Sequence, residues 1–118
     1  MTKGLEIYVI KLPMEKKMIG PGSDIEAISK FFAELSDHSQ RVGIQSAREL
    51  ILSRVKDRGL QTGLTLAAEG NHPTVVRQYL SEALLHEWQS DLYSKLLEAV
   101  HRWQTGCAQE EVLACFRP

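Results

Sequence analysis

Residues 73–104, PTVVRQYLSEALLHEWQSDLYSKLLEAVHRWQ, decide how this sequence folds. Pro73 suits the first turn of a helix, the preceding Gly70-Asn71-His72 is a turn signal, and Gly106 beyond the segment is a stop signal. As one helix the segment would be roughly 46 Å long. That length is large for a chain of 118 residues.

The apolar residues of this segment change sides on a helical wheel around residues 85–90. The first group is Val76, Tyr79, Leu80, Ala83 and Leu84, and the second, nearly opposite, is Leu85, Trp88, Leu92, Leu96, Ala99 and Trp103. A single straight helix that packs on one core would keep its apolar residues on one side. Either the helix breaks near residues 89–91, with Ser90 as a new cap, or its halves pack on different neighbours, one of them a second subunit.

The N-terminal residues 5–12 (LEIYVIKL) predict a single β-strand, because they are rich in β-branched and aromatic residues and Pro13 follows them. Both faces of this strand are apolar, and a lone strand leaves its backbone donors and acceptors unpaired. Residues 60–66 (LQTGLTL) are the internal candidate for pairing, although they could equally be helical. The alternative is the same strand of a second copy, so we expect a homodimer.

Two medium helices are predicted between the strand and residue 60. Residues 14–22 indicate a loop, and Ser23 with Glu26 has the spacing of a capping box at a helix start. The first apolar stripe is Ile25, Ile28, Phe32 and Leu35, and the second is Ile44, Ala47, Ile51 and Val55. The polar residues 36–43 (SDHSQRVG) predict a break or kink between them. Gly59 is expected just after the second helix, with Lys56 and Arg58 against its C-terminal dipole.

The predicted fold class is therefore mainly α, a small helical domain over residues 1–118 with one N-terminal β-strand, paired in a dimer. A short helix over residues 108–116 completes it. The composition of 43% hydrophobic and 25% charged residues is that of a globular protein. Fourteen basic and fifteen acidic residues give a net charge of −1, which argues against broad electrostatic attraction to nucleic acid.

The expected location is cytoplasmic. The N-terminus lacks the pattern of a signal peptide, and no apolar stretch is long enough to span a bilayer. Cys107 and Cys115 are eight residues apart, which in a helix is too far for a disulfide, so reduced thiols are expected.

The histidines and cysteines do not predict a metal or catalytic site. No two of His38, His72, His86 and His101 have the spacing of helical metal ligands, and His101 with the two cysteines matches no zinc pattern. Glu82 precedes His86 by four residues and Glu98 precedes His101 by three. Such pairs orient imidazoles in acid–base catalysis, but they are also ordinary neighbours on a helix surface. We favour the surface interpretation because no nucleophile motif accompanies them, and we expect no cofactor, no metal and no enzymatic activity.

A protein-binding surface is the favoured site. Aromatic residues and arginines dominate the energetics of protein interfaces, and the long helical segment carries Tyr79, Trp88, Tyr93 and Trp103. The candidate partner-binding residues are Tyr79, Trp88, Leu92, Tyr93, Leu96 and Trp103.

The run of residues 43–51 (GIQSARELI) resembles the start of the second helix in ribbon-helix-helix DNA-binding proteins. In that family, paired strands from a dimer enter the major groove. The resemblance covers under half of the chain. The predicted strand presents apolar residues where that family has polar and basic residues that contact bases.

The sequence thus favours a non-catalytic protein-binding regulator that acts as a homodimer: an adaptor, a chaperone or an anti-activator of a transcription regulator. Small helical bacterial anti-activators are similar to this chain in size and in general helical character. The alternatives are a ribbon-helix-helix-like DNA-binding regulator and a small enzyme that uses a helix-borne histidine.

Overall fold

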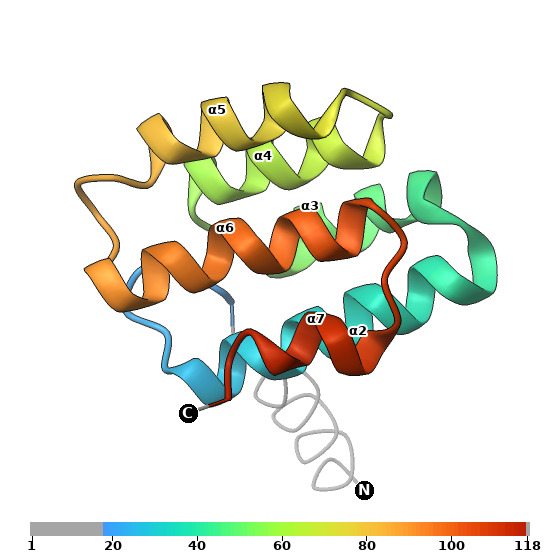
Figure 1. Ribbon diagram of the computed structural model, residues 1–118, viewed down its shortest axis with the longest axis horizontal. Coiled ribbons are helices and arrows are strands. Elements are labelled where there is room, and N and C mark those ends of the chain that lie inside the picture. The colour runs from blue at the N-terminus through green and yellow to red at the C-terminus, as the bar shows by residue number, and fades with distance from the viewer. Residues whose placement is uncertain (1–17, 118) are drawn as a thin grey trace, which may run out of the picture.

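The computed structural model describes residues 18–117, and this part of the chain is mainly helical, as predicted (Figure 1). The predicted strand over residues 5–12 lies outside the described residues. The elements are α2 (Ile25–Val42), the 3₁₀ turn η1 (Ile44–Ala47), α3 (Arg48–Arg54), α4 (Arg58–Ala68), α5 (Pro73–Ala83), α6 (Ser90–Gln104) and α7 (Gln109–Ala114). None of these helices is both long enough and apolar enough to cross a membrane.

Helix α6 lies between two helical pairs, α4 with α5 on one side and α2 with α7 on the other (Figure 1). The core is continuous across all of them. Its largest fully buried side chains include Phe31, Phe32, Ile51, Leu64, Leu80 and Leu96. The Phe32 and Phe116 rings, with centroids 5.3 Å apart, join the start of the fold to its end.

Helix α2 begins one residue later than predicted, and its break falls at Gly43, the last residue of the stretch in which the break was predicted. Asp24 is its N-cap and accepts a hydrogen bond from the Ala27 N–H at 2.8 Å, whereas the Ser23 hydroxyl accepts from the Gly20 N–H at 3.0 Å. Most of this polar stretch, residues 36–42, is helical, and Ser36 is buried in the core. The break is at Gly43, whose φ of +107° favours glycine.

The second predicted helix ends earlier than expected, so the predicted roles of Lys56, Arg58 and Gly59 at its C-terminus are wrong. Helix α3 stops at Arg54, and Val55 is extended and forms an isolated parallel bridge with Ile19. Within this bridge the Ile19 N–H donates to the Arg54 carbonyl at 2.7 Å.

Helix α4 occupies the residues that were the internal candidate for a strand. The Asp57 carboxylate caps this helix by accepting from the Leu60 N–H at 2.9 Å. Arg58 and Gly59 therefore lie in its first turn, and residues 60–66 are helical. The capping carboxylate decides in favour of helix in a segment whose apolar pattern is ambiguous.

Residues 73–104 form two helices, and the break between them falls where the change of apolar face predicted it. His72 caps α5 by accepting from the Thr74 N–H at 3.1 Å, and Pro73 is the first helical residue. Helix α6 begins at Ser90, with Gln89 rather than Ser90 in the N-cap position. Each helix buries its own apolar face within this chain, so the change of face no longer requires a second subunit.

A buried arginine joins α2 to α3. Arg54 is 9% exposed, forms an ion pair with Glu34, and lies over the Phe31 ring with its guanidinium carbon 5.8 Å from the ring centroid. Arginine suits this position because its planar group can stack on an aromatic ring while binding a carboxylate.

Candidate binding cleft between α5 and α6

A cleft of about 390 Å³ lies between α5 and α6. It is lined by Pro73, Thr74, Arg77, Gln78 and Ser81 of α5 and by His101 of α6. The α5 residues have the spacing of one helical face. This face lies beside the one that α5 buries through Val76 and Leu80, so the helix packs on the core and still presents a polar wall.

A hydrogen bond fixes the distance between the two walls. The Tyr93 hydroxyl of α6 donates to the Ser81 carbonyl of α5 at 2.7 Å. Tyr93 is partly buried and packs against the core, so core packing also positions its ring. The cleft is thus held open by the packing of the helices.

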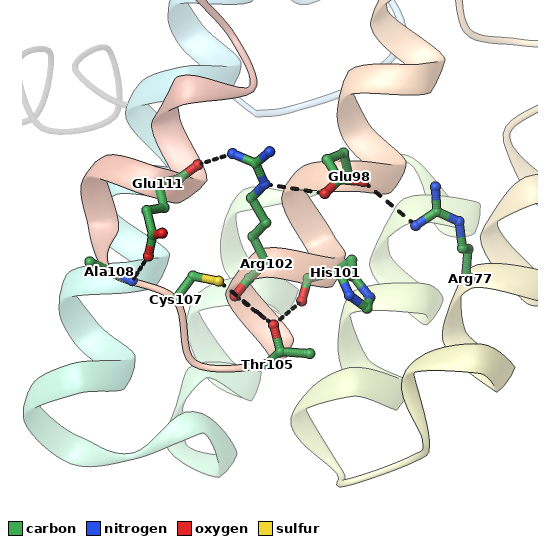
Figure 2. A network of polar contacts seen from close by, with 8 residues as sticks. All are labelled: Arg77, Glu98, His101, Arg102, Thr105, Cys107, Ala108 and Glu111. Carbon is green, nitrogen blue, oxygen red and sulfur yellow. Dashed lines mark hydrogen bonds and ion pairs between the residues drawn. The ribbon is translucent and has the colours of Figure 1, made fainter.

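A network of polar contacts centred on Glu98 joins three helices next to the cleft (Figure 2). The Glu98 carboxylate lies between two guanidinium groups, that of Arg102 at 3.1 Å and that of Arg77 at 3.8 Å. Arg102 also donates to the Glu111 carbonyl of α7 at 2.8 Å. These side chains are between about a third and a half exposed, so solvent screens each ion pair and it contributes little to stability.

The network includes one of the two glutamate–histidine pairs that the sequence suggested, Glu98 with His101. Glu98 binds arginines, and the contact of His101 in the network is through its backbone carbonyl, which accepts from the Thr105 hydroxyl at 2.8 Å (Figure 2). Glu82 and His86 are both exposed, and α5 ends at Ala83, so they do not share a helix. Neither pair has the geometry of a carboxylate that orients an imidazole.

The two cysteines lie at opposite ends of α7, and both are free and partly buried. Burial raises the pKa of the Cys115 thiol, and the nearby Arg102 guanidinium offsets part of this rise. The pKa of Arg102 is raised, first by its hydrogen bond to Glu98 and then by Cys115. Since the thiolate is the reactive form, a raised pKa makes Cys115 a poor nucleophile at neutral pH.

Across residues 18–117, no group of three histidine, cysteine or acidic side chains is arranged to hold a metal ion. The set of His101, Cys107 and Cys115 that was considered from the sequence therefore does not converge in this fold.

The predicted partner-binding residues lie mostly inside the domain. Trp88, Leu96 and Trp103 belong to the core with at most 4% exposure, and Tyr79, Leu92 and Tyr93 are partly buried against it. The six do not form one exposed surface. Leu92 lines a groove at the N-terminal ends of α2 and α6, and Trp103 lines a pocket between α2 and α6. That any of them contacts a partner stays a prediction.

Sequence reasoning missed the polar wall of the cleft. Thr74, Arg77, Gln78 and Ser81 recur at helical spacing on a segment whose start was correctly recognised at Pro73. That spacing was a usable signal for this face, but the aromatic residues of the same segment indicated the buried face instead.

Comparisons with protein families, with curated proteins and with solved structures found no match to this chain.

Proposed function

We propose that this protein is a non-catalytic, homodimeric protein-binding regulator, of the adaptor, chaperone or anti-activator class, and that it binds its partner through the α5–α6 cleft. The observation that carries this proposal is the cleft itself, which is lined by a polar face of α5 and by His101 of α6.

The chemistry of the rim indicates what kind of partner segment would fit. Arg77 lines the cleft, and its ion pair with Glu98 is long at 3.8 Å, whereas Arg102 holds the same carboxylate at 3.1 Å. Arg77 can therefore turn toward a carboxylate of the partner while Glu98 remains paired. We propose an amphipathic helix that places an apolar residue against Pro73 and an acidic residue against Arg77, which line the cleft one helical turn apart, as in helix-in-groove recognition.

The homodimer is proposed from the sequence of residues 5–12, because both apolar faces of the predicted strand need to be buried. A homodimer would carry two α5–α6 clefts, one from each copy. Sedimentation of the full chain tests this part separately, since a protein that stays monomeric at micromolar concentration contradicts the dimer without affecting the cleft.

Site-specific photocrosslinking in the native host tests the cleft. A photoreactive amino acid at Gln78, in the cleft, is compared with the same residue at Gln45, which is exposed on η1. We expect one protein to be crosslinked at position 78 only, and the crosslinked segment to be an amphipathic helix with an acidic residue. As a synthetic peptide this segment should bind the purified chain, and Arg77→Glu should weaken binding at least about tenfold, since the mutation replaces attraction by repulsion.

Equal crosslinking at both positions, or peptide binding that Arg77→Glu leaves unchanged, would contradict this assignment. The second hypothesis, a ribbon-helix-helix-like DNA-binding regulator, would be favoured if duplex DNA bound with a steep dependence on salt.

A further inference from the structure

The α5–α6 cleft is lined by hydrogen-bond donors that the protein leaves unused. The Ser81 hydroxyl donates to the Gln78 carbonyl at 2.9 Å. Within residues 18–117, however, the Thr74 hydroxyl, the Gln78 amide and the His101 imidazole have no hydrogen-bond partner, although all three line the cleft. Thr74 and Gln78 are exposed and His101 is half-buried. A ligand in the cleft can therefore reach three donors that no protein group occupies.

Arg77 adds a guanidinium group to these donors. Its side chain is 48% exposed, and its Nη1 atom lies 3.8 Å from Glu98 Oε1, which is longer than a hydrogen bond. Thr74 precedes Arg77 by three residues, so the two side chains lie on the same face of α5. The N–H groups of a guanidinium form a planar fork that fits two oxygens of one anion. Arg77 can therefore bind an anion in the cleft without first losing a hydrogen bond.

The lining of the cleft is complementary in charge to an anion. None of its residues is acidic, and two of them, Arg77 and His101, can be cationic. The His101 ring points from α6 toward α5, the helix that carries Arg77 (Figure 2). Glu98 lies beside Arg77, but Arg102 pairs with the same carboxylate at 3.1 Å. Two guanidinium groups and a protonated imidazole therefore outweigh this one carboxylate by two positive charges.

A phosphomonoester matches this lining better than a carboxylate does. A phosphorylated serine or threonine has three terminal oxygens and a charge of about −1.5 to −2 at neutral pH, whereas a carboxylate has two oxygens and a single charge. A dianion also favours the charged form of a neighbouring imidazole, so His101 would donate a charged hydrogen bond to it. Arginine side chains are the usual groups that recognise phosphorylated segments.

We infer that the acidic residue that the α5–α6 cleft receives is a phosphorylated serine or threonine of the partner helix, bound by Arg77, His101 and the Thr74 hydroxyl. This inference rests on the proposed function, because it names the residue that the partner places against Arg77. The protein then binds the phosphorylated form of its partner and not the unmodified form.

Four small probes test the inference by NMR on the full chain. Three are the N-acetyl amides of phosphoserine, glutamate and serine. The fourth is diethyl phosphate, which carries the single charge of a nucleic-acid phosphodiester. The side-chain signals of Arg77 and His101 are the readout. Those of Arg58 and His86 are internal controls, because both residues are exposed and neither lines the cleft.

We expect the phosphoserine probe to shift the Arg77 and His101 signals in a saturable way. It should bind at least about fivefold more tightly than the glutamate probe, because it brings a second charge and a third oxygen. Diethyl phosphate should bind no better than the glutamate probe, and the serine probe should not bind. The Arg58 and His86 signals should not move with any probe.

Two matched pairs of variants assign the binding groups. Arg77→Lys keeps the charge but loses the planar fork, so it should weaken phosphoserine binding severalfold, whereas Arg58→Lys should not. His101→Gln removes the charge that pairs with the second charge of the phosphate. It should reduce the preference for phosphoserine over glutamate, whereas His86→Gln should preserve it. None of these four side chains belongs to the buried core, so the variants should remain folded.

The source of the phosphate is tested in the native host. The segment that is crosslinked at position 78 should contain a phosphorylated serine or threonine, and phosphatase treatment should abolish its binding. An unphosphorylated segment whose binding still depends on Arg77 would overturn the inference and leave the proposed function standing. If the probes bind as expected but position 78 captures no protein, the proposed partner is wrong. The inference then fails as well, because the phosphate would belong to a small molecule.

The probes alone can also overturn the inference. It is wrong if the glutamate probe binds as tightly as the phosphoserine probe, if no probe moves the Arg77 and His101 signals, or if Arg58 and His86 respond equally. Equal binding of diethyl phosphate would also contradict it and would favour a nucleic-acid backbone as the ligand.

Discussion

The α4–α5 interface and the interfaces of α6 with α5 and α7 are held together in opposite ways. Helices α4 and α5 approach so closely that a Cβ atom on Gly63 would lie 2.2 Å from a methyl carbon of Leu80. Between α6 and its neighbours, the outer contacts are polar and half exposed, centred on Glu98 (Figure 2). The first interface leaves no space between the helices, and the second borders the α5–α6 cleft.

This difference separates the contacts that stabilise the domain from the contacts that another molecule could replace. A glycine contact at a buried leucine gives dense packing, and dense packing resists any change in volume. Exposed ion pairs contribute little energy and can be exchanged for contacts with another molecule. Helix α5 takes part in both interfaces, so it anchors the domain through Leu80 and presents Arg77 at the cleft.

The largest expected effect comes from filling the glycine contact. Gly63→Ala should destabilise the protein by about 2 kcal/mol, because the new methyl group overlaps a side chain that is 1% exposed and has nowhere to move. Leu80→Ala alone should cost about 3 kcal/mol through the cavity it leaves. In the Leu80→Ala background, Gly63→Ala should cost almost nothing, because the clash is gone and alanine is the better helix former. Urea denaturation of the four proteins measures this coupling.

Gly22→Ala is the control for the glycine substitution, since no atom lies within 4 Å of its Cβ position and its backbone is not in the left-handed region. It should leave the free energy of unfolding unchanged. Additive effects of Gly63→Ala and Leu80→Ala would mean that the two helices do not touch at this point.

The fold was predictable from the sequence wherever a local signal decides it. Pro73 and His72 set the start of α5, Gly43 ends α2, and the reversal of apolar face located the break before Ser90. The end of α3 was not predictable, because the pairing of Val55 with Ile19 is a contact between distant segments.

The candidate site was harder to predict from the sequence, because it too depends on contacts between distant segments. A tryptophan on an amphipathic helix has the same local signature whether it faces a core or a partner, and only the packing of α2 against α6 places Trp103 inside. The polar face of α5 could be read from the helical spacing of its residues, but the cleft itself depends on α6 lying beside α5, which no local pattern indicates.

A smaller effect is expected at the polar interface. Glu98→Gln keeps the shape of the side chain but removes the charge that pairs with Arg102 and Arg77. The substitution should lower the free energy of unfolding by less than about 1 kcal/mol at low ionic strength. This loss should shrink further as salt screens the exposed charges. Denaturation curves at two salt concentrations measure this, with Glu87→Gln, exposed in the turn before α6, as the control. A loss as large as that of Gly63→Ala, or one independent of salt, would remove the contrast between the two interfaces.

The smallest effect concerns Cys115, which lies close enough to Arg102 for their charges to interact. Burial raises the pKa of this thiol in the folded chain above the ordinary value of 9.0, so the folded state holds its proton more tightly than the unfolded state does. The resulting stabilisation is complete below about pH 9 and is lost as the pH rises through the folded pKa.

Cys115→Ser should therefore flatten the alkaline decline in stability slightly, and alkylation at mildly alkaline pH should modify Cys115 severalfold more slowly than Cys107. The two thiols should react alike in denaturant, where burial is gone. If Cys115 instead reacted faster in the folded chain, the end of α7 would be open to solvent and the polar interface would be looser than its hydrogen bonds indicate.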